Sequence, residues 1–173
     1  MADGSLQPSG EVVALVAVQS ALAQRPGVVG AARAMSHFGE HSAGWLAVSA
    51  LGALLSPQRR SDWLLAGAGA LGAHAAAVLI KRAVRRKRPD HPAVEVNVGT
   101  PSALSFPSAH ATSTTTAAIL MGPLTGLPLP VLLVPPMALS RLVLGVHYPS
   151  DVLAGVAVGA LVAQLVKKIG SRR

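Results

Sequence analysis

The sequence predicts an all-α protein, a polytopic membrane helical bundle of about five transmembrane helices preceded by an N-terminal interfacial or re-entrant helix. Hydrophobic residues make up 51% of the 173 residues, charged residues only 13%, and the mean hydropathy is +0.49. Because about a quarter of the residues of a typical soluble domain are charged, this composition favours a membrane protein. The apolar residues also form segments of helical length separated by turns with Gly, Pro and Arg, as expected for a chain that crosses a bilayer several times.

The N-terminal part divides into a tail, residues 1–10, predicted to be disordered, and a helical segment, residues 11–38, predicted to be interfacial. Residues 11–24 are apolar, but a helix of that length reaches only about 21 Å. The hydrocarbon core of a bilayer is about 30 Å thick. We therefore expect this helix to lie in the interface or to re-enter the membrane. Pro26 and Gly27 interrupt it, and residues 28–38 are expected to continue the interfacial part.

Residues 39–56 are predicted to form the first membrane helix and residues 61–82 the second, joined by a polar turn. Trp45 and Trp63 lie near the starts of these two antiparallel helices, where they would mark opposite interfaces. Small residues recur on one face of the second helix, which allows close packing inside the bundle or formation of a homo-oligomer. These small residues are Ala66, Gly69, Ala70 and Ala73.

Three further apolar segments, residues 107–124, 129–146 and 149–166, are predicted to be membrane helices. The first begins with proline, which helices favour in their first turn. The second contains three prolines, which neighbouring helices can accommodate by satisfying the freed carbonyl groups. Residues 90–105 form a connector long enough to cover a site, and we expect it to help select the substrate's headgroup.

Charge and cysteine content limit the possible partners. Lys and Arg outnumber Asp and Glu by 15 to 7, which gives a net charge of +8. This excess would suit nucleic acid in a soluble protein, but the aromatic content is only 3% and the cations flank apolar segments. We therefore expect the bilayer and its anionic headgroups, and no nucleic acid, as partners. The chain contains no cysteine, which excludes disulfides and thiolate metal sites.

Residues 140–151, with the sequence SRLVLGVHYPSD, contain the residue types that phosphate chemistry needs. The guanidinium of Arg141 is a rigid fork of donors for phosphate oxygens. The imidazole of His147 can act as a nucleophile or a base at neutral pH. Asp151, four residues later, could hold the other ring nitrogen and make the free nitrogen a better nucleophile. Taken alone, such residues near a helix end are more often surface or capping residues.

Two other stretches complete a known pattern. Residues 81–89 have the sequence KRAVRRKRP and residues 106–111 the sequence FPSAHA. Together with residues 140–151 they resemble the three signature motifs of the type 2 phosphatidic acid phosphatase superfamily, KxxxxxxRP, PSGH and SRxxxxxHxxxD. Ala109 departs from the pattern because the family has Gly there. The matching residues are Lys81, Arg88, Pro89, Pro107, Ser108, His110, Ser140, Arg141, His147 and Asp151.

The resemblance implies a lipid phosphate phosphatase, with residues 39–173 as its transmembrane phosphatase domain. It implies that His147, held by Asp151, attacks phosphorus to form a phosphohistidine. His110 would protonate the leaving alkoxide and then activate the water that releases phosphate. No metal or other cofactor would be needed. The implied substrate-binding residues are Lys81, Arg88, Ser108, Ala109 and Arg141.

The predicted helix directions offer a check that is independent of the motifs. If the last four spans alternate in direction, the residues of all three motifs lie at the same membrane surface. The positive-inside rule does not orient that surface, because six cations remain on each side once the three proposed phosphate ligands are set aside. We expect a multi-pass protein of the inner (plasma) membrane with its active site at the cytoplasmic face, where the substrate would be made.

The second helix and the segment that follows it contain further polar residues. Arg82, Arg85, Arg86 and Lys87 are expected to form a solvated basic face that touches lipid phosphates. His74 lies seven residues before Lys81, on the same face of the helix and two turns deeper. A polar side chain at that depth is a candidate for function, and a hydrogen bond to a neighbouring helix is the alternative.

The sequence allows several alternative substrates and activities. The substrate's tail would stay in the bilayer, which allows phosphatidate, phosphatidylglycerol phosphate, isoprenoid pyrophosphate or an isoprenoid-linked sugar phosphate. A lipid phosphotransferase would use the same phosphohistidine with an alcohol acceptor. Vanadate-dependent haloperoxidases share the motifs but are large soluble proteins. A lipid-binding membrane scaffold would leave His110, His147 and Asp151 without a purpose.

Overall fold

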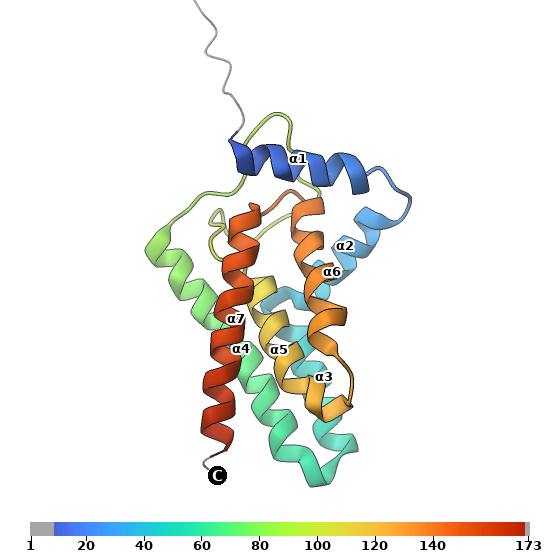
Figure 1. Cartoon of the computed structure of the whole chain (residues 1–173), viewed down its shortest axis with the longest axis vertical. Helices are drawn as coiled ribbons and strands as arrows, with labels where there is room; N and C mark the ends of the chain where they lie inside the picture. The colour runs from blue at the N-terminus through green and yellow to red at the C-terminus, as the bar shows by residue number, and fades with distance from the viewer. Residues whose placement is uncertain (1–8, 172–173) are drawn as a thin grey trace, which may run out of the picture.

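The computed structural model describes residues 9–171, and within them the chain is entirely helical apart from loops and one isolated bridge (Figure 1). Of the predicted tail, residues 1–8 lie outside the described residues. The helices are α1 (Gly10–Leu22), α2 (Val28–Gly39), α3 (Ala43–Leu55), α4 (Arg60–Val84), α5 (Ala109–Thr125), α6 (Leu129–Val143) and α7 (Pro149–Gly170), with short 3-10 helices η1 (Glu40–Ser42) and η2 (Pro57–Arg59).

Helix α1 lies across the end of the bundle where α6 ends and α7 begins (Figure 1). Helix α1 is largely apolar, and a buried glutamine fixes its position. The side-chain amide of Gln19 donates to the carbonyl oxygens of Glu95 (2.6 Å) and Val143 (3.1 Å), and its oxygen accepts from the amide of Glu95 (3.1 Å). Helix α1 is therefore held against both the long connector and α6.

The first expected membrane helix, residues 39–56, is divided in the structure. Helix α2 continues to Gly39, and α3 begins only at Ala43. Between them His41 and Ser42 have positive φ angles of 50° and 61°, which break the helical path. Helix α3 has 13 residues and reaches about 20 Å, so it is too short to cross a bilayer alone. Helices α2 and α3 follow one another along the bundle (Figure 1).

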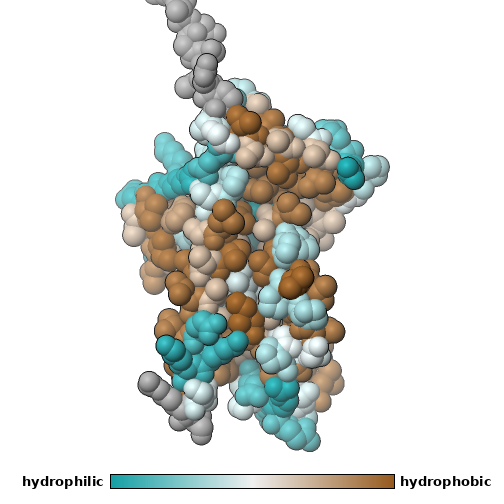
Figure 2. All heavy atoms as spheres, in the orientation of Figure 1, coloured by the Kyte–Doolittle hydropathy of each residue, from teal (hydrophilic) through white to brown (hydrophobic). Residues whose placement is uncertain are grey.

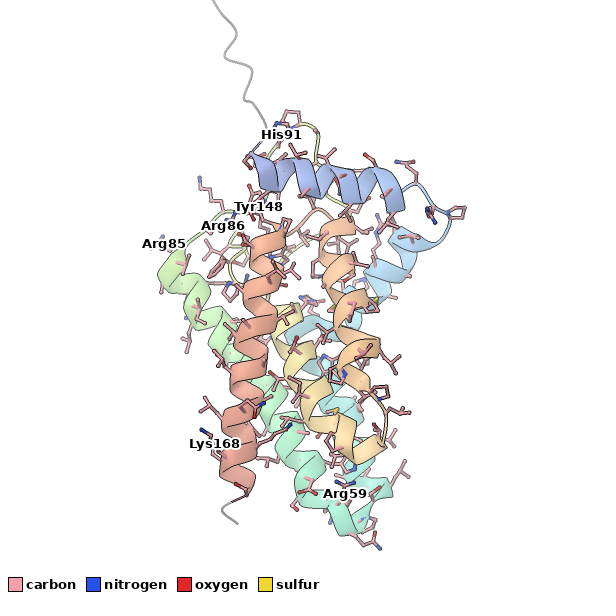
Figure 3. The ribbon with its side chains drawn as sticks, in the orientation of Figure 1. Arg59, Arg85, Arg86, His91, Tyr148 and Lys168 are labelled. Carbon is pink, nitrogen blue, oxygen red and sulfur yellow. The ribbon has the colours of Figure 1, made fainter. Side chains whose placement is uncertain are left out.

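Helices α4 and α7 are long and apolar enough to cross a membrane, whereas α6 is shorter. An apolar surface separates two polar ends of the molecule (Figure 2). Arg85, Arg86 and Tyr148 lie at the end that α1 covers, and Arg59 and Lys168 lie at the opposite end (Figure 3). This is an all-helical membrane fold. The number of five crossings stays a prediction.

Helix α5 occupies the centre of the bundle, and small residues let its neighbours approach it. A Cβ atom added to Gly155 would lie 2.7 Å from the carbonyl oxygen of Ser108, and one added to Gly159 would lie 2.4 Å from that of Thr112. The Thr116 hydroxyl donates to the carbonyl oxygen of Gly159 at 2.8 Å. The small face of α4 is likewise buried inside the chain. Oligomerisation through small-residue faces stays a prediction.

The two tryptophans do not mark opposite interfaces. Trp45 and Trp63 are both buried and belong to one apolar cluster with residues of α4 and α5. Trp63 packs where Gly52 lacks a side chain, since a Cβ on that glycine would fall 2.2 Å from the indole ring. Packing between α3 and α4 therefore prevailed over the interfacial preference of tryptophan.

Candidate active site

The three motif segments surround one cavity of about 680 Å³ near the end of the bundle that α1 covers. The cavity lies at the end of α4, the beginning of α5 and the turn between α6 and α7. Of the eight residues proposed from the sequence, Ser108 and Asp151 do not line it. The six that do are Lys81, Arg88, Ala109, His110, Arg141 and His147.

His147 lies in the turn after α6, which Gly145 makes possible. Gly145 has a φ of +69°, and a Cβ atom there would fall 2.2 Å from the carbonyl oxygen of Glu95. The His147 side chain is almost fully buried, with Asp151 buried behind it. Nε2 lies 3.2 Å from Nη1 of Arg88. Because a guanidinium can only donate, Nε2 carries the lone pair and Nδ1 the proton.

The charge state of His147 follows from its surroundings. Burial is the main cause that lowers the pKa of His147, to about 3. The nearby Asp151 carboxylate opposes this shift, and the cations Arg88 and Lys81 add to it. The imidazole is therefore neutral at physiological pH, with its Nε2 lone pair facing the cavity side where Arg88 lies. Nδ1 is 3.6 Å from Oδ2 of Asp151, a distance somewhat longer than that of a hydrogen bond.

Lys81 and Arg88 are fixed by backbone carbonyl groups. Nζ of Lys81 donates to the carbonyl oxygens of Leu104 (3.2 Å) and Ser105 (2.7 Å). Arg88 donates to the carbonyl oxygens of Ser102 (2.8 Å) and Val146 (2.6 Å). Burial lowers the pKa of Arg88 to about 10, so the group remains a cation at neutral pH. Carbonyl groups of the connector thus hold both cations in the wall of the cavity.

Arg141 and His110 are both held by Ser36 of α2. Arg141 is 2% exposed, and its Nη1 donates to the Ser36 hydroxyl at 3.1 Å. Its Nη2 is buried without a hydrogen-bond partner among the described residues. Nε2 of His110 lies 2.9 Å from the carbonyl oxygen of Ser36. Since a carbonyl oxygen only accepts, Nε2 carries a proton and Nδ1 is left for proton exchange. Nothing in the sequence marked Ser36, which acts partly through its backbone.

The beginning of α5 differs slightly from the expectation. The helix starts at Ala109, and Ser108 is its N-cap, with a hydroxyl that accepts from the amide of Ala111 at 3.5 Å. Ser108 is fully buried, so the side chain caps the helix rather than lining the cavity. The non-glycine residues with positive φ in residues 9–171 are His41, Ser42 and Arg85. Alanine at position 109 therefore fits without strain, and the first-turn amides point toward the cavity end of the helix.

Arg86 does not belong to a solvated basic face, contrary to the expectation. Its guanidinium donates to Oδ1 of Asp151 (3.0 Å) and to the Ser150 hydroxyl (2.6 Å), and it lies 4.2 Å from the centroid of the Tyr148 ring. It also forms an ion pair with Glu11 of α1. Arg82, Arg85 and Lys87 are exposed, and Arg82 also lines the cavity. Their contact with lipid phosphates stays a prediction.

The pKa shifts of Arg86 and Glu11 agree with their ion pair. Burial alone would lower the pKa of Arg86, but the hydrogen bond to Glu11 and the charge of Asp151 raise it above its ordinary value. Burial would raise the pKa of Glu11, but hydrogen bonds from Ser150 and Arg86 hold it below its ordinary value. Glu11 also accepts from the Ser150 amide at 3.1 Å. A chain of contacts thus runs from Glu11 through Arg86 and Asp151 to His147.

The chain matches a family model and is similar to named proteins over most of its length. The model of the PAP2 superfamily matches residues 62–173. The chain is similar to a protein of Mycobacterium tuberculosis (strain CDC 1551 / Oshkosh) named decaprenylphosphoryl-5-phosphoribose phosphatase, with 68% identity over 96% of this chain and 94% of the relative. A protein of the same name from Mycolicibacterium smegmatis is 70% identical over 86% of this chain and 82% of its own length.

The fold is also similar to a solved structure. The crystal structure of the first transmembrane PAP2 type phosphatidylglycerolphosphate phosphatase, from Bacillus subtilis, has a TM-score of 0.72. The comparison covers 96% of this chain and 89% of that chain at 22% identity. At this level of identity the likeness concerns the fold alone.

Proposed function

The chain belongs to the PAP2 superfamily and is a membrane lipid phosphatase, and from this premise we propose that it removes the terminal phosphate of decaprenylphosphoryl-5-phosphoribose. The observation that carries the proposal is the near full-length identity of 68% to a relative of that name. The cavity supports it, because four Lys or Arg side chains and five histidines line a space large enough for a sugar phosphate beside an apolar wall.

We propose that His147 is the nucleophile. Nε2 attacks phosphorus, the bond from phosphorus to the sugar oxygen breaks, and a phosphohistidine forms. His110 enters this step as an imidazolium, with Nε2–H still bonded to the Ser36 carbonyl, and gives its Nδ1 proton to the departing alkoxide. It then takes a proton from the water that attacks phosphorus, the P–N bond breaks, and inorganic phosphate leaves. Asp151 stabilises the imidazolium that develops during attack.

We propose that the cations bind the non-bridging phosphate oxygens. Arg141 offers its Nη2, which has no partner among the described residues, and Lys81 and Arg88 line the same cavity. When substrate binds, the Arg88 N–H group that points at Nε2 of His147 would donate to a phosphate oxygen instead. This change of partner frees the nucleophile. The amides of Ala109 and His110 would add donors and the positive end of the helix dipole. Ser108 would contribute indirectly by capping α5.

The proposed substrate is tested by phosphate release from a panel of lipids with purified protein in nanodiscs. The panel contains decaprenylphosphoryl-5-phosphoribose, phosphatidate, phosphatidylglycerol phosphate and an isoprenoid pyrophosphate. We expect the ribose lipid to have the highest kcat/KM. A higher kcat/KM for phosphatidylglycerol phosphate or for the pyrophosphate would contradict the proposal. Transfer of phosphate to an added alcohol, in place of release, would identify a phosphotransferase.

Arg86 is proposed to be a positioning residue that holds the Asp151 carboxylate for His147. We expect Arg86→Gln to lower kcat about tenfold with little change in KM, because a hydrogen-bonded charge contact of this kind is lost. Arg86→Lys should recover part of the rate, and Glu11→Gln should have a smaller effect of the same kind. The measurement is steady-state phosphate release by protein that remains monodisperse.

The matched control for Arg86 is its neighbour. Arg85→Gln removes the same charge from the adjacent residue. The Arg85 side chain is exposed and lies at the same end of the bundle (Figure 3). We expect it to leave kcat and KM unchanged. An equal loss in the Arg85 variant, or a rise in KM alone for Arg86→Gln, would show that Arg86 contributes only general positive charge.

We further propose five membrane crossings, with α2 and α3 together forming the first, and an active site at the cytoplasmic face of the inner (plasma) membrane. Sugar phosphates are made in the cytoplasm, which supports this orientation. Because the sequence has no cysteine, single Arg85→Cys and Lys168→Cys variants report the two ends. In intact spheroplasts an impermeant maleimide should label only Lys168→Cys. Labelling of Arg85→Cys alone would reverse the orientation.

A further inference from the structure

The cavity continues beyond the residues that hold the phosphate. Its wall also includes His37, Glu40 and His41 at the junction of α2 and η1, and His74 of α4. His74 lies seven residues before Lys81, so it is about 10 Å farther along the axis of α4, away from the end covered by α1. The proposed chemistry uses none of these four side chains, although polar groups on membrane helices are costly unless they have a function.

His41 and His74 form a pair in this part of the wall. Their ring centroids are 5.7 Å apart, with the planes tilted by 41°. Nδ1 of His74 is buried and has no hydrogen-bond partner within residues 9–171. An imidazole nitrogen left unpaired in such a place destabilises the fold. A group from a bound ligand would satisfy it.

The backbone is strained where it presents His41. His41 and Ser42 are consecutive non-glycine residues with φ angles of 50° and 61°, a conformation that costs free energy at each residue. The buried Ser42 hydroxyl, which donates to the carbonyl oxygen of Ala70 at 3.3 Å, ties this break to α4. Strain of this kind persists when surrounding contacts enforce it, and it concentrates at binding sites.

We propose that His41 and His74 form a second anion subsite, which binds the phosphodiester that joins the sugar to the lipid. This inference rests on the proposed function, because it requires a substrate with two phosphates separated by one polyol unit. Imidazole N–H groups donate to the phosphodiester oxygens while the terminal phosphate occupies the site of Arg141 and His147. Ala75, Val78 and Leu79 line the same cavity on α4 between His74 and Lys81, so they give the substrate an apolar wall between the two phosphate sites.

The acidic residue in this region is compatible with the anion. Glu40 lies 3.9 Å from Nδ1 of His37, and both side chains are largely exposed. The carboxylate is an acceptor, so it suits the hydroxyl groups of the sugar rather than a phosphate. The cavity thus offers donors for two phosphates with an acceptor for the polyol, which distinguishes this substrate class from a lipid with a single phosphate.

The test compares two lipids in one enzyme. Decaprenylphosphoryl-5-phosphoribose carries the phosphodiester, and phosphatidate lacks it while keeping the phosphomonoester. We expect His74→Phe to raise KM for the ribose lipid about 10- to 30-fold, the effect of losing one hydrogen bond to a charged group. Turnover of phosphatidate and inhibition by orthovanadate, which needs only the phosphate site, should be unchanged. His74→Gln retains an N–H donor and should recover most of the affinity.

The control is His91→Phe, which removes a histidine of the connector that does not line the cavity and should alter neither substrate. A parallel loss on both lipids and on orthovanadate in His74→Phe would show a structural role and overturn the subsite. An unchanged KM for the ribose lipid would overturn it as well. If wild-type protein does not hydrolyse the ribose lipid, the proposed function fails separately. Phosphatidylglycerol phosphate, with the same order of phosphodiester, polyol and monoester, then replaces it in the same comparison.

Discussion

His147→Asn is expected to lower phosphate release by more than about 10⁴-fold, because it removes the atom proposed to attack phosphorus. Asparagine places its amide nitrogen near the position of Nδ1, so the contact toward Asp151 can be kept while Nε2 is lost. The nearly complete burial of His147 makes a small, polar replacement preferable to alanine. The rate should therefore fall for lack of a nucleophile rather than for lack of folding.

A trapping experiment separates the nucleophile from a general base. Wild-type protein quenched during turnover of a ³²P-labelled lipid should retain label that is stable in base and labile in acid, as a phosphohistidine is. His147→Asn should retain none, whereas His110→Gln should accumulate it or form it slowly. Label that persists in His147→Asn, or activity close to that of wild type, would show that the attacking group lies elsewhere. His91→Asn serves as the matched substitution outside the cavity.

The convergence of the motifs could be anticipated because it depends on local signals. Apolar segments of helical length and the turns between them fix the order and direction of α4 to α7. The three motif segments lie at the ends of those helices. Residue spacing also suffices for His147 and Asp151, because His147 lies in the turn just before α7 and Asp151 in the first turn of that helix. Such contacts are encoded within a few residues, and the sequence therefore predicts them.

Contacts between distant segments could not be anticipated in the same way. Glu11 pairs with Arg86 across 75 residues, and nothing in an apolar N-terminal helix indicates which cation its first acidic residue will meet. Ser36 holds His110 through a backbone carbonyl, which any residue type could supply. The break at His41 lies in a stretch without proline. Packing between elements that are distant in the sequence decides these features, and residue spacing does not record it.

Arg141→Lys is expected to lower kcat/KM about 100- to 1000-fold although it keeps the charge, since one donor aimed at the transition state is worth that much. The guanidinium divides its donors between the protein and the cavity. Nη1 donates to Ser36 and Nε to the Ser140 hydroxyl at 3.2 Å, which leaves Nη2 unpaired among the described residues. A single ammonium group cannot hold both serines and still reach a phosphate oxygen in the same geometry.

The loss in Arg141→Lys should divide unequally between binding and chemistry. The lysine charge still attracts the phosphate, so KM should rise only modestly, while kcat should carry most of the loss because the fork no longer fits the transition state. Inhibition by orthovanadate, which adopts the five-coordinate geometry, should weaken more than inhibition by inorganic phosphate. Arg85→Lys, the same exchange at an exposed position, should change neither. Equal weakening of both anions would reduce Arg141 to a source of charge, and an unaltered kcat would remove it from the proposed site.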